Sequence, residues 1–187
     1  KEVLFVGRLV EEKGCHLYVN AIKSIVKRYP EWKFHIIGTE RAGQKILTST
    51  YAKNLISEFE SLGKNTEYLG FISNEEVSNI LKKTSILIVP SIWQEPFALT
   101  ALEGVCNGAA VIASKVGGMQ EMLEDVGMLI NDIDAIKLEK SILSLLENEN
   151  LLNNYHNKSW VNYKYNQQDI VKIQDEVRTN IFKKYNY

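Results

Sequence analysis

Ile86-Leu87-Ile88-Val89-Pro90 is an unbroken apolar run, and a loop that contains Trp93 and Glu95 follows it directly. Five further short segments have a similar character, and they are Val3–Val6, Phe34–Ile37, Glu67–Leu69, Val111–Ala113 and Met128–Ile130. Several of the six are continuous rather than alternating, which is typical of strands buried on both faces. The runs therefore predict an α/β fold with a parallel sheet of about six strands.

Segments with helical periodicity or helix-capping residues lie between these runs. They are Tyr18 to Tyr29 stopped by Pro30, Leu55 to Leu62 with Gly63 as a C-cap glycine, a capping box at Ser73-Asn74-Glu75-Glu76 that opens a helix through Leu81, Leu99–Asn107 closed by Gly108, Met119–Leu123 and Asp134–Leu146. Strands joined by helical crossovers predict a doubly wound sheet with helices on both faces.

Composition and charge exclude several classes of protein. The 187 residues carry a formal net charge of −1, with 22 Lys and Arg against 23 Asp and Glu, which argues against nucleic-acid binding through bulk charge. An apolar content of 45% excludes a disordered or collagen-like chain. The longest apolar run is too short to cross a bilayer. Cys15 and Cys106 form no C-x-x-C pair, so we expect reduced thiols and a cytoplasmic protein.

The chain begins at Lys1, directly before an apolar run and without a signal peptide, which indicates a piece of a longer protein. Residues 1–149 are expected to form the α/β domain. Residues 150–187 are rich in Asn, Lys and Tyr, and we expect a helical tail with intermittent apolar anchors at Val171, Val177 and Ile181. Such sparse anchors indicate a tail that packs partly on this domain and partly on something absent from the chain.

The first loop of interest is Gly7–Gly14. In a doubly wound sheet of order 3-2-1-4-5-6, ligands bind where strands 1 and 4 end side by side. The loop matches neither the dinucleotide fingerprint nor the P-loop, and instead it carries two cations, Arg8 and Lys13. A guanidinium and an ammonium suit a diphosphate. The alternative is that both cations pair with Glu11 and Glu12 on a solvated turn.

The second loop, Pro90–Phe97, should face the first. Pro96 biases Glu95 toward an extended backbone at the mouth of the crevice. Glu103 follows two helical turns later in an apolar segment, where a carboxylate is costly unless it meets a cation or several hydroxyl donors. A ribose diol and a buried ion pair both remain open at this stage. The free amides at the start of this helix could also hold phosphate oxygens.

Together these motifs resemble the nucleotide-sugar half of family 4 (group 1) glycosyltransferases. The resemblance lies in Gly7-Arg8-Leu9 with Glu12-Lys13-Gly14, Pro90-Ser91 with Glu95-Pro96-Phe97 and Leu102-Glu103, and Gly108 with Val111–Ser114, Gly117-Gly118 and Glu121. The Glu95-to-Glu103 spacing fits the E-x7-E motif of that family. It implies the Rossmann-like C-terminal half of a GT-B fold, whose N-terminal acceptor domain is absent here. Residues 1–149 would then be the donor-binding domain.

The resemblance also implies roles for individual residues. Arg8 and Lys13 would hold the donor diphosphate and, with Glu95 on the sugar hydroxyls, form the catalytic set. The remaining donor-binding positions would be Gly7, Phe71 and Ile72 near the base, Phe97, Ala98, Leu99 and Thr100 at the helix start, and Glu103 on the ribose. The reaction would be retaining and would need no metal or other cofactor. A UDP-sugar is the favoured donor.

The resemblance extends to partners and location. The acceptor would be a saccharide or a lipid-linked molecule held by the absent domain, in the synthesis of cell-surface polysaccharide or glycolipid. Any peripheral contact with the inner face of the membrane would be made through that domain. A nucleotide-sugar-binding module without transfer activity, and an epimerase or phosphorylase on the same fold, are the alternative functions.

Several residues depart from the family pattern or allow a second interpretation. Ala98 stands where glycine is usual, Gly104 where alanine is usual, Ala110 where proline is usual, and Gly38-Thr39-Glu40 lacks a second glycine. Asp132-Ile133-Asp134 matches a metal-binding D-x-D, but Asp134 is better explained as a helix N-cap. We expect His35 in the core, His16 at the rim of the crevice, His156 in the polar tail, and Trp93 either stacked on a ligand or packed in its loop.

Overall fold

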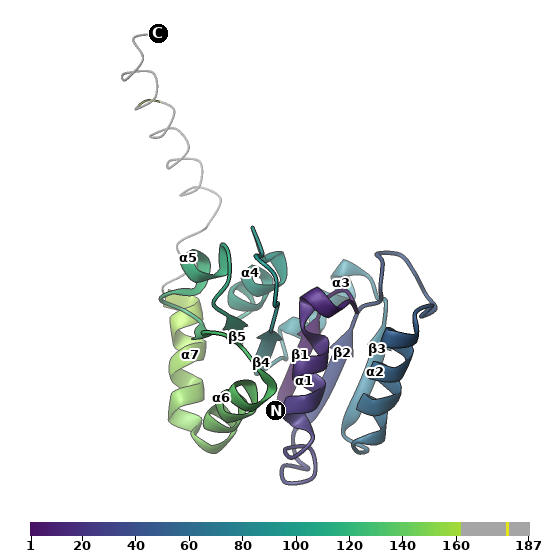
Figure 1. Ribbon diagram of the computed structural model, residues 1–187. Helices are drawn as coiled ribbons and strands as arrows, with labels where there is room; N and C mark the ends of the chain where they lie inside the picture. Colours follow the sequence, from purple (N-terminus) through teal and green to yellow (C-terminus); the bar gives the residue numbers. More distant parts are fainter. Residues whose placement is uncertain (162–178, 180–187) are drawn as a thin grey trace.

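The computed structural model describes residues 1–161 and residue 179. Six parallel strands form one sheet in the order β3-β2-β1-β4-β5-β6 (Figure 1). The strands are β1 (Glu2–Val6), β2 (Lys33–Ile37), β3 (Thr66–Gly70), β4 (Ile86–Val89), β5 (Ala110–Ser114) and β6 (Met128–Ile130). The predicted strands and their order are confirmed, with ends that differ by one residue at most. The anchors expected at Val171, Val177 and Ile181 lie outside the described residues.

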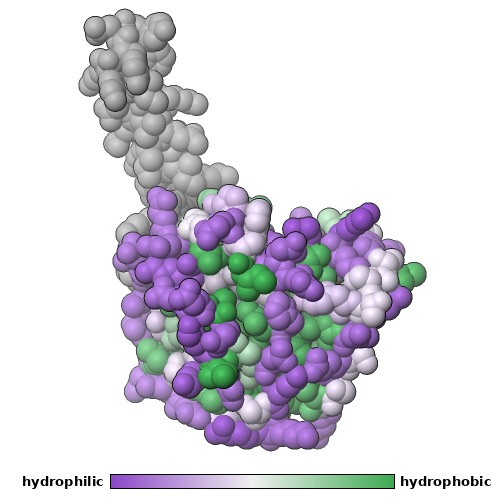
Figure 2. All heavy atoms as spheres, in the orientation of Figure 1, coloured by the Kyte–Doolittle hydropathy of each residue, from purple (hydrophilic) through white to green (hydrophobic). Residues whose placement is uncertain are grey.

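Helices cover both faces of the sheet, as predicted. The helices are α1 (Cys15–Ile22), α2 (Thr50–Ser61), α3 (Asn74–Leu81), α4 (Leu99–Cys106), α5 (Met119–Leu123), α6 (Ala135–Glu147) and α7 (Glu149–Val161). Successive strand residues point to opposite faces, so Val3 and Phe5 pack against α1, α2 and α6, while Leu4 packs toward α3, α4 and α5. Polar residues predominate on the outer face that carries α1 and α6 (Figure 2).

One predicted helix end and one predicted cap are wrong. α1 ends at Ile22 rather than continuing to Tyr29, because the following turns bond partly to carbonyls three residues back, as from Ile25 N to Ile22 O at 2.9 Å. Ile25 and Val26 are nevertheless fully buried. The apolar stripe therefore predicted correctly which residues are buried, but not where the regular helix ends. Gly63 does not adopt a left-handed conformation after α2. Its missing Cβ instead leaves room for Val26, whose Cγ1 would lie 2.9 Å from it.

The polar caps agree with the sequence. Ser73 and Glu76 form the reciprocal capping box at the start of α3, and Ser49 caps α2 by accepting from Ala52 N at 3.1 Å. Asp134 caps α6 by accepting from Lys137 N at 2.7 Å. In each of these three helices the N-cap side chain therefore accepts from one of the first backbone amides.

The helix α7 packs on the domain. His156 Nε2 lies 2.9 Å from the carbonyl oxygen of Ser85, and the Ser159 hydroxyl donates to Ala109 O at 3.1 Å. Leu152 is buried against the same core as α6. His156, expected in a polar tail, thus ties α7 to the chain segment before β4. The division of the chain into a domain of residues 1–149 and a tail of residues 150–187 stays a prediction. Among the described helices, none has both the length and the apolar character needed to span a membrane.

Candidate functional site

Three loops interlock where β1, β4 and β5 end. The Ile92 amide donates to the carbonyl of Glu12 at 2.9 Å, which joins the loop after β4 to the loop after β1. The Gly118 amide donates to the carbonyl of Glu95 at 2.8 Å, which joins the loop after β5 to the loop after β4. A Cβ at Gly117 would lie 2.2 Å from that same carbonyl oxygen, so only glycine permits this approach. The backbone at Glu95 is therefore held from outside its own loop.

A cavity of about 210 Å³ lies between the first two loops. It is lined by Phe5, Val6, Gly7, Lys13, Val89, Pro90, Ser91, Glu95, Phe97, Ala98, Leu99 and Thr100. Seven of these twelve are residues that the sequence singled out, from Gly7 and Lys13 through Glu95 to Thr100. The two loops do face each other, as the strand order predicts.

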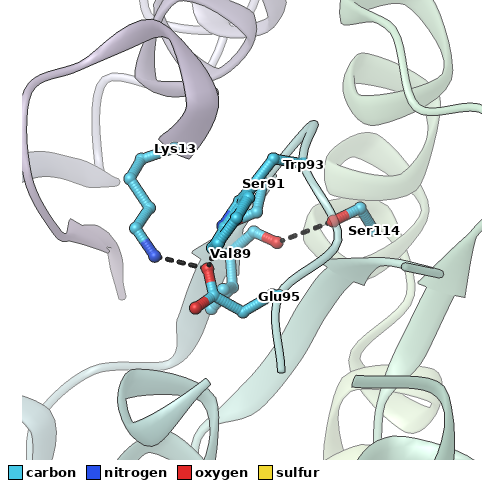
Figure 3. A network of polar contacts seen from close by, with 6 residues as sticks. All are labelled: Lys13, Val89, Ser91, Trp93, Glu95 and Ser114. Carbon is cyan, nitrogen blue, oxygen red and sulfur yellow. Dashed lines mark hydrogen bonds and ion pairs between the residues drawn. The ribbon is translucent and has the colours of Figure 1, made fainter. Parts of the chain in front are cut away.

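Glu95 is the buried charge of this cavity, with only 8% of its surface exposed. It forms an ion pair with Lys13, whose ammonium reaches across from the loop after β1 (Figure 3). The Trp93 indole donates to the same carboxylate oxygen, Oε2, at 3.2 Å, and Ser91 Oγ lies 3.4 Å from it. The alternative considered for Lys13, a pairing with Glu11 or Glu12 on a solvated turn, is wrong, because the strand order brings Glu95 within its reach.

These contacts set the ionisation of Glu95. Burial alone raises the pKa of a carboxyl, but the hydrogen bonds from Lys13 and Trp93, together with the charge of Lys13, outweigh it. The net result is a pKa of Glu95 below its ordinary value. The cavity therefore holds a carboxylate that is ionised at neutral pH and is paired with the side chain of Lys13.

Arg8 lies apart from this pair. Its side chain is exposed, and within the described part of the chain no ion pair or hydrogen bond holds it. Gly7, directly before it, is fixed by donation of its amide to Ile37 O at 3.0 Å and lines the cavity. A pairing of Arg8 with Glu11 or Glu12 is not formed, so the guanidinium is available to an external anion.

The helix that opens into the cavity has no side-chain cap. α4 begins after Ala98, whereas α2, α3 and α6 are capped by Ser49, Ser73 and Asp134. Leu99 and Thr100, the first two residues of α4, line the cavity. Uncapped amides at a helix start carry partial positive charge and favour an anion. This combination is what a phosphate group requires.

The departures from the family pattern are compatible with this geometry. Ala98 has a φ of −88°, a conformation that alanine adopts without strain, so the backbone there does not need glycine. A Cβ at Gly104 would lie 2.3 Å from Leu87 Cδ2, which explains glycine in place of alanine. Ala110 donates its amide to Ser85 O at 3.0 Å, a bond that proline would lose.

Glu103 is not part of the same cavity. It is exposed on α4 and lines a separate cavity of about 140 Å³ with Asn74, Val77, Ser78, Leu81 and Asn107. The buried ion pair considered for Glu103 is wrong, since no cation of the described chain contacts it and partial burial alone raises its pKa. Glu103 lies on the exposed face of α4, where α4 and α3 together line this second cavity. Glu95 and Glu103 thus line two separate cavities.

Phe71 and Ile72 follow β3 and also lie outside the cavity of Glu95. Phe71 is exposed, while Ile72 packs partly against the core on the α3 and α4 side. Trp93, for which stacking and packing were both open, is 47% exposed and uses its N–H on Glu95, so packing alone does not describe it. Sequence reasoning missed that Ser91 and Trp93 bond the carboxylate. The signal that could have indicated these bonds is the position of both residues in the same loop, four and two residues before Glu95.

The histidines take no part in the cavity. His35 is buried in β2, as predicted, and its Nδ1 lies 3.6 Å from Glu67 Oε2 without a hydrogen bond. Burial lowers the pKa of His35, so the ring is neutral at physiological pH. His16 Nδ1 lies 3.1 Å from the Tyr51 hydroxyl. Cys15 is buried and Cys106 exposed, and neither forms a disulfide.

The D-x-D segment does not form a metal site in the described residues, where no group of three or more possible ligands gathers. Asp134 instead caps α6. Replacing Asp134 by alanine is expected to remove about 1 kcal/mol of stability and to lower Tm by about 2–4 °C. Asp134→Ser, which retains a capping oxygen but no carboxylate, should remain near wild type. Thermal unfolding with and without Mn²⁺ measures both, and a metal-dependent Tm that Asp134→Ser abolishes would contradict the cap.

Comparison with known proteins agrees with this architecture. The family model described as "Glycosyl transferases group 1" matches residues 1–162. An uncharacterized glycosyltransferase of Methanocaldococcus jannaschii is 35% identical over 150 residues, which are 79% of this chain and 39% of that protein. The lipopolysaccharide 1,2-N-acetylglucosaminetransferase of Salmonella typhimurium is 26% identical over 97% of this chain and 49% of its own length. The chain thus spans half or less of these curated relatives.

Solved structures share the fold. HepE of Anabaena, crystallised with UDP, superposes with a TM-score of 0.78 at 21% identity, over 96% of this chain and 48% of that one. The C-terminal domain of a group 1 glycosyltransferase from Francisella tularensis superposes with a TM-score of 0.74 at 23% identity, over 85% of this chain and 82% of that domain. The sheet order and the family match lead to one conclusion: this chain belongs to the group 1 glycosyltransferases, with the Rossmann-like fold of a GT-B C-terminal domain.

Proposed function

We propose that this chain is the donor-binding half of a retaining glycosyltransferase. The complete protein would move a hexosyl or N-acetylhexosaminyl group from a nucleotide diphosphate sugar, with UDP-sugars favoured, to a saccharide or lipid-linked acceptor. Synthesis of cell-surface polysaccharide or glycolipid is the process in which we place it. The observation that carries the proposal is the cavity in which Lys13, Glu95 and the uncapped start of α4 converge.

The cavity, together with Arg8 and Glu103 outside it, suits the successive parts of such a donor. The ammonium of Lys13, the exposed guanidinium of Arg8 and the first amides of α4 suit a diphosphate, and they would stabilise charge that develops on it as the sugar leaves. The carboxylate of Glu95 suits sugar hydroxyls, and Glu103 in its separate cavity suits the ribose diol. The base would then lie near Phe71 and Ile72. No metal or other cofactor has a role in this scheme.

The comparisons support the choice of donor. Structures of HepE from Anabaena contain UDP, UDP with glucose, and UDP-glucose. Curated relatives include the acetylglucosaminetransferase of Salmonella typhimurium and a phosphatidyl-myo-inositol mannosyltransferase of Mycobacterium tuberculosis, which is 26% identical over 83% of this chain. We therefore take UDP and UDP-glucose as the first ligands to test.

Transfer is proposed to need the other half of the protein. Ile92, Trp93, Phe97 and Leu99 are between 47% and 63% exposed around the cavity, and they leave an apolar rim that the acceptor domain would cover. Excluding water and holding the acceptor near the sugar carbon account for several kcal/mol of a barrier. Residues 1–187 should therefore bind donor without transferring it, and the parent protein should turn over.

The decisive experiment titrates residues 1–187 with UDP, GDP, ADP and UDP-glucose by calorimetry. We expect one nucleotide diphosphate to bind and to raise Tm by mass action. Absence of binding to every nucleotide would contradict the proposal. Acceptor-dependent turnover by residues 1–187 alone would contradict the need for a second half. Binding without turnover in the parent would favour a binding module, and isomerisation or phosphate dependence would favour an epimerase or phosphorylase.

Arg8→Ala provides a residue-level test of the diphosphate. Loss of a charge-assisted contact should weaken the binding of UDP by about ten- to a hundredfold, because such contacts are worth roughly 1.5–3 kcal/mol. UMP should lose less. The matched control is Arg28→Ala, which removes another exposed arginine whose partner is Glu147, far from the cavity. An equal loss of affinity for UDP and UMP, or no loss, would show that Arg8 does not contact the diphosphate.

A further inference from the structure

The carboxylate of Glu95 is bonded asymmetrically. Lys13, Trp93 and Ser91 all direct their donors at Oε2. The other oxygen, Oε1, accepts no hydrogen bond from the described residues, and Figure 3 shows it turned away from Trp93. A carboxylate held on one oxygen has the lone pairs of the other free for hydroxyl groups. The arrangement therefore fixes which oxygen a ligand in the cavity can reach.

The three donors differ in how firmly each can be held on Oε2 of Glu95. Lys13 is a mobile cation on a flexible stem, and a diphosphate entering the cavity would compete with Glu95 for its ammonium. Trp93 is neutral, and its ring has only two side-chain torsions. The Glu95 backbone is held by Gly118, so the indole N–H and the carboxylate approach each other from one short, anchored segment. The bond from Trp93 to Glu95 therefore does not depend on Lys13.

We propose that Trp93 is a positioning residue for Glu95, which it holds through Oε2 so that Oε1 faces the hydroxyl groups of the donor sugar. The inference rests on the proposed function and deepens it, since it concerns the sugar and not the diphosphate. Ser91, at a longer distance, assists. The exposed part of the indole is then a consequence of its place at the cavity mouth, and its N–H is the part that acts.

The test separates sugar binding from diphosphate binding. Trp93→Phe keeps an aromatic ring and loses the N–H, while Ile92→Ala, which alters an exposed neighbour without a side-chain contact to Glu95, is the matched control. Binding is measured for UDP, GDP, UDP-glucose, UDP-galactose, UDP-N-acetylglucosamine and GDP-mannose. For each sugar nucleotide, the sugar-dependent gain is the factor by which it binds more tightly than its own nucleoside diphosphate. The sugar nucleotide with the largest gain is used. In Trp93→Phe this gain should fall about tenfold, with diphosphate binding within about twofold of wild type.

A second measurement follows the carboxyl carbon of Glu95 by ¹³C NMR as pH is lowered. Trp93 is among the groups that lower the pKa of Glu95, so Trp93→Phe should raise it, and Ile92→Ala should not. The sugar-dependent gain should then be lost at a higher pH in the variant. A merely structural role would lower Tm without moving this profile.

The outcomes are distinct. If no nucleotide binds to wild type, the proposed function fails, whereas the NMR titration still tests whether Trp93 holds Glu95. An unchanged Glu95 titration in Trp93→Phe overturns the positioning role. So does a wild-type chain that gains nothing from any sugar, or a variant that retains its full sugar gain. A raised pKa together with a selective loss of the sugar gain supports it.

Discussion

Replacing Gly14 by alanine is expected to lower the free energy of unfolding by about 2–5 kcal/mol and to disrupt the cavity between the first two loops. Gly14 has a φ of +69°, a left-handed conformation that costs an alanine about 1–2 kcal/mol. Its Cβ would also lie 1.9 Å from the carbonyl oxygen of Pro90, so one of the two loops must move. Such overpacking costs about 1–3 kcal/mol more.

Gly70→Ala is the matched control. Gly70 has a φ of +68°, nearly the same backbone conformation, but nothing lies within 4 Å of its Cβ position. It should lose only the conformational part, about 1–2 kcal/mol. Chemical denaturation measures both variants, and calorimetry measures nucleotide binding by Gly14→Ala under conditions where it is folded. Equal destabilisation of the two variants would show that the approach of Gly14 to Pro90 does not constrain the site.

Replacing Lys13 by methionine is expected to remove about 1–3 kcal/mol of stability at neutral pH. The change leaves Glu95 buried and charged with only Trp93 and Ser91 as donors, and an uncompensated buried charge costs several kcal/mol when nothing relieves it. The matched control, Lys23→Met, breaks an ion pair with Glu58 in which both side chains are 44% exposed. Exposed pairs contribute about 0–1 kcal/mol, so that variant should stay near wild type.

The loss in Lys13→Met should depend on pH. In wild type the pKa of Glu95 is lowered, so its contribution to stability is present above the ordinary carboxyl range and is lost as pH falls through the lowered value. Without Lys13, its hydrogen bond and its charge no longer lower the pKa of Glu95, so this pKa rises and protonation relieves the variant on acidification. The difference in unfolding free energy should therefore shrink below about pH 4.

Glu95→Gln in the Lys13→Met background provides the check on this account. Removing the charge should recover part of the stability at neutral pH, and the double variant should show none of the relief on acidification that Lys13→Met shows. Urea unfolding between pH 3.5 and 7.5 measures all three chains. A difference for Lys13→Met that stays constant over this range would show that the ammonium stabilises the fold by packing and not by its pairing with Glu95.

The sheet could be predicted from short stretches of sequence because its signals are local. Continuous apolar runs such as Ile86–Val89 can be buried only in the middle of a layered structure, and right-handed crossovers leave few strand orders. The caps at Ser73 and Asp134 were equally local, since the cap and its amide lie three residues apart. The carboxyl ends of neighbouring strands then indicated which loops would meet.

The partners within the site could not be read in the same way. The pairing of Lys13 with Glu95 joins residues 82 positions apart, and Glu11 or Glu12 was the nearer alternative along the chain. The face of α4 on which Glu103 lies depends on how that helix packs on the sheet. The end of α1 at Ile22 depends on tertiary packing, because Ile25 and Val26 are buried with or without regular helical bonds.

The sequence by itself therefore determined the strands, their order, the two loops of the cavity and the membership suggested by their motifs. Only the tertiary structure decided that Lys13 and Trp93 share one oxygen of Glu95, that Arg8 is exposed, and that Glu103 lines a second cavity. The physical reason is one of range. The sequence patterns that predict burial and capping each extend over a few residues. A hydrogen bond across a crevice instead requires two distant backbone segments to be placed to within a fraction of the length of that bond.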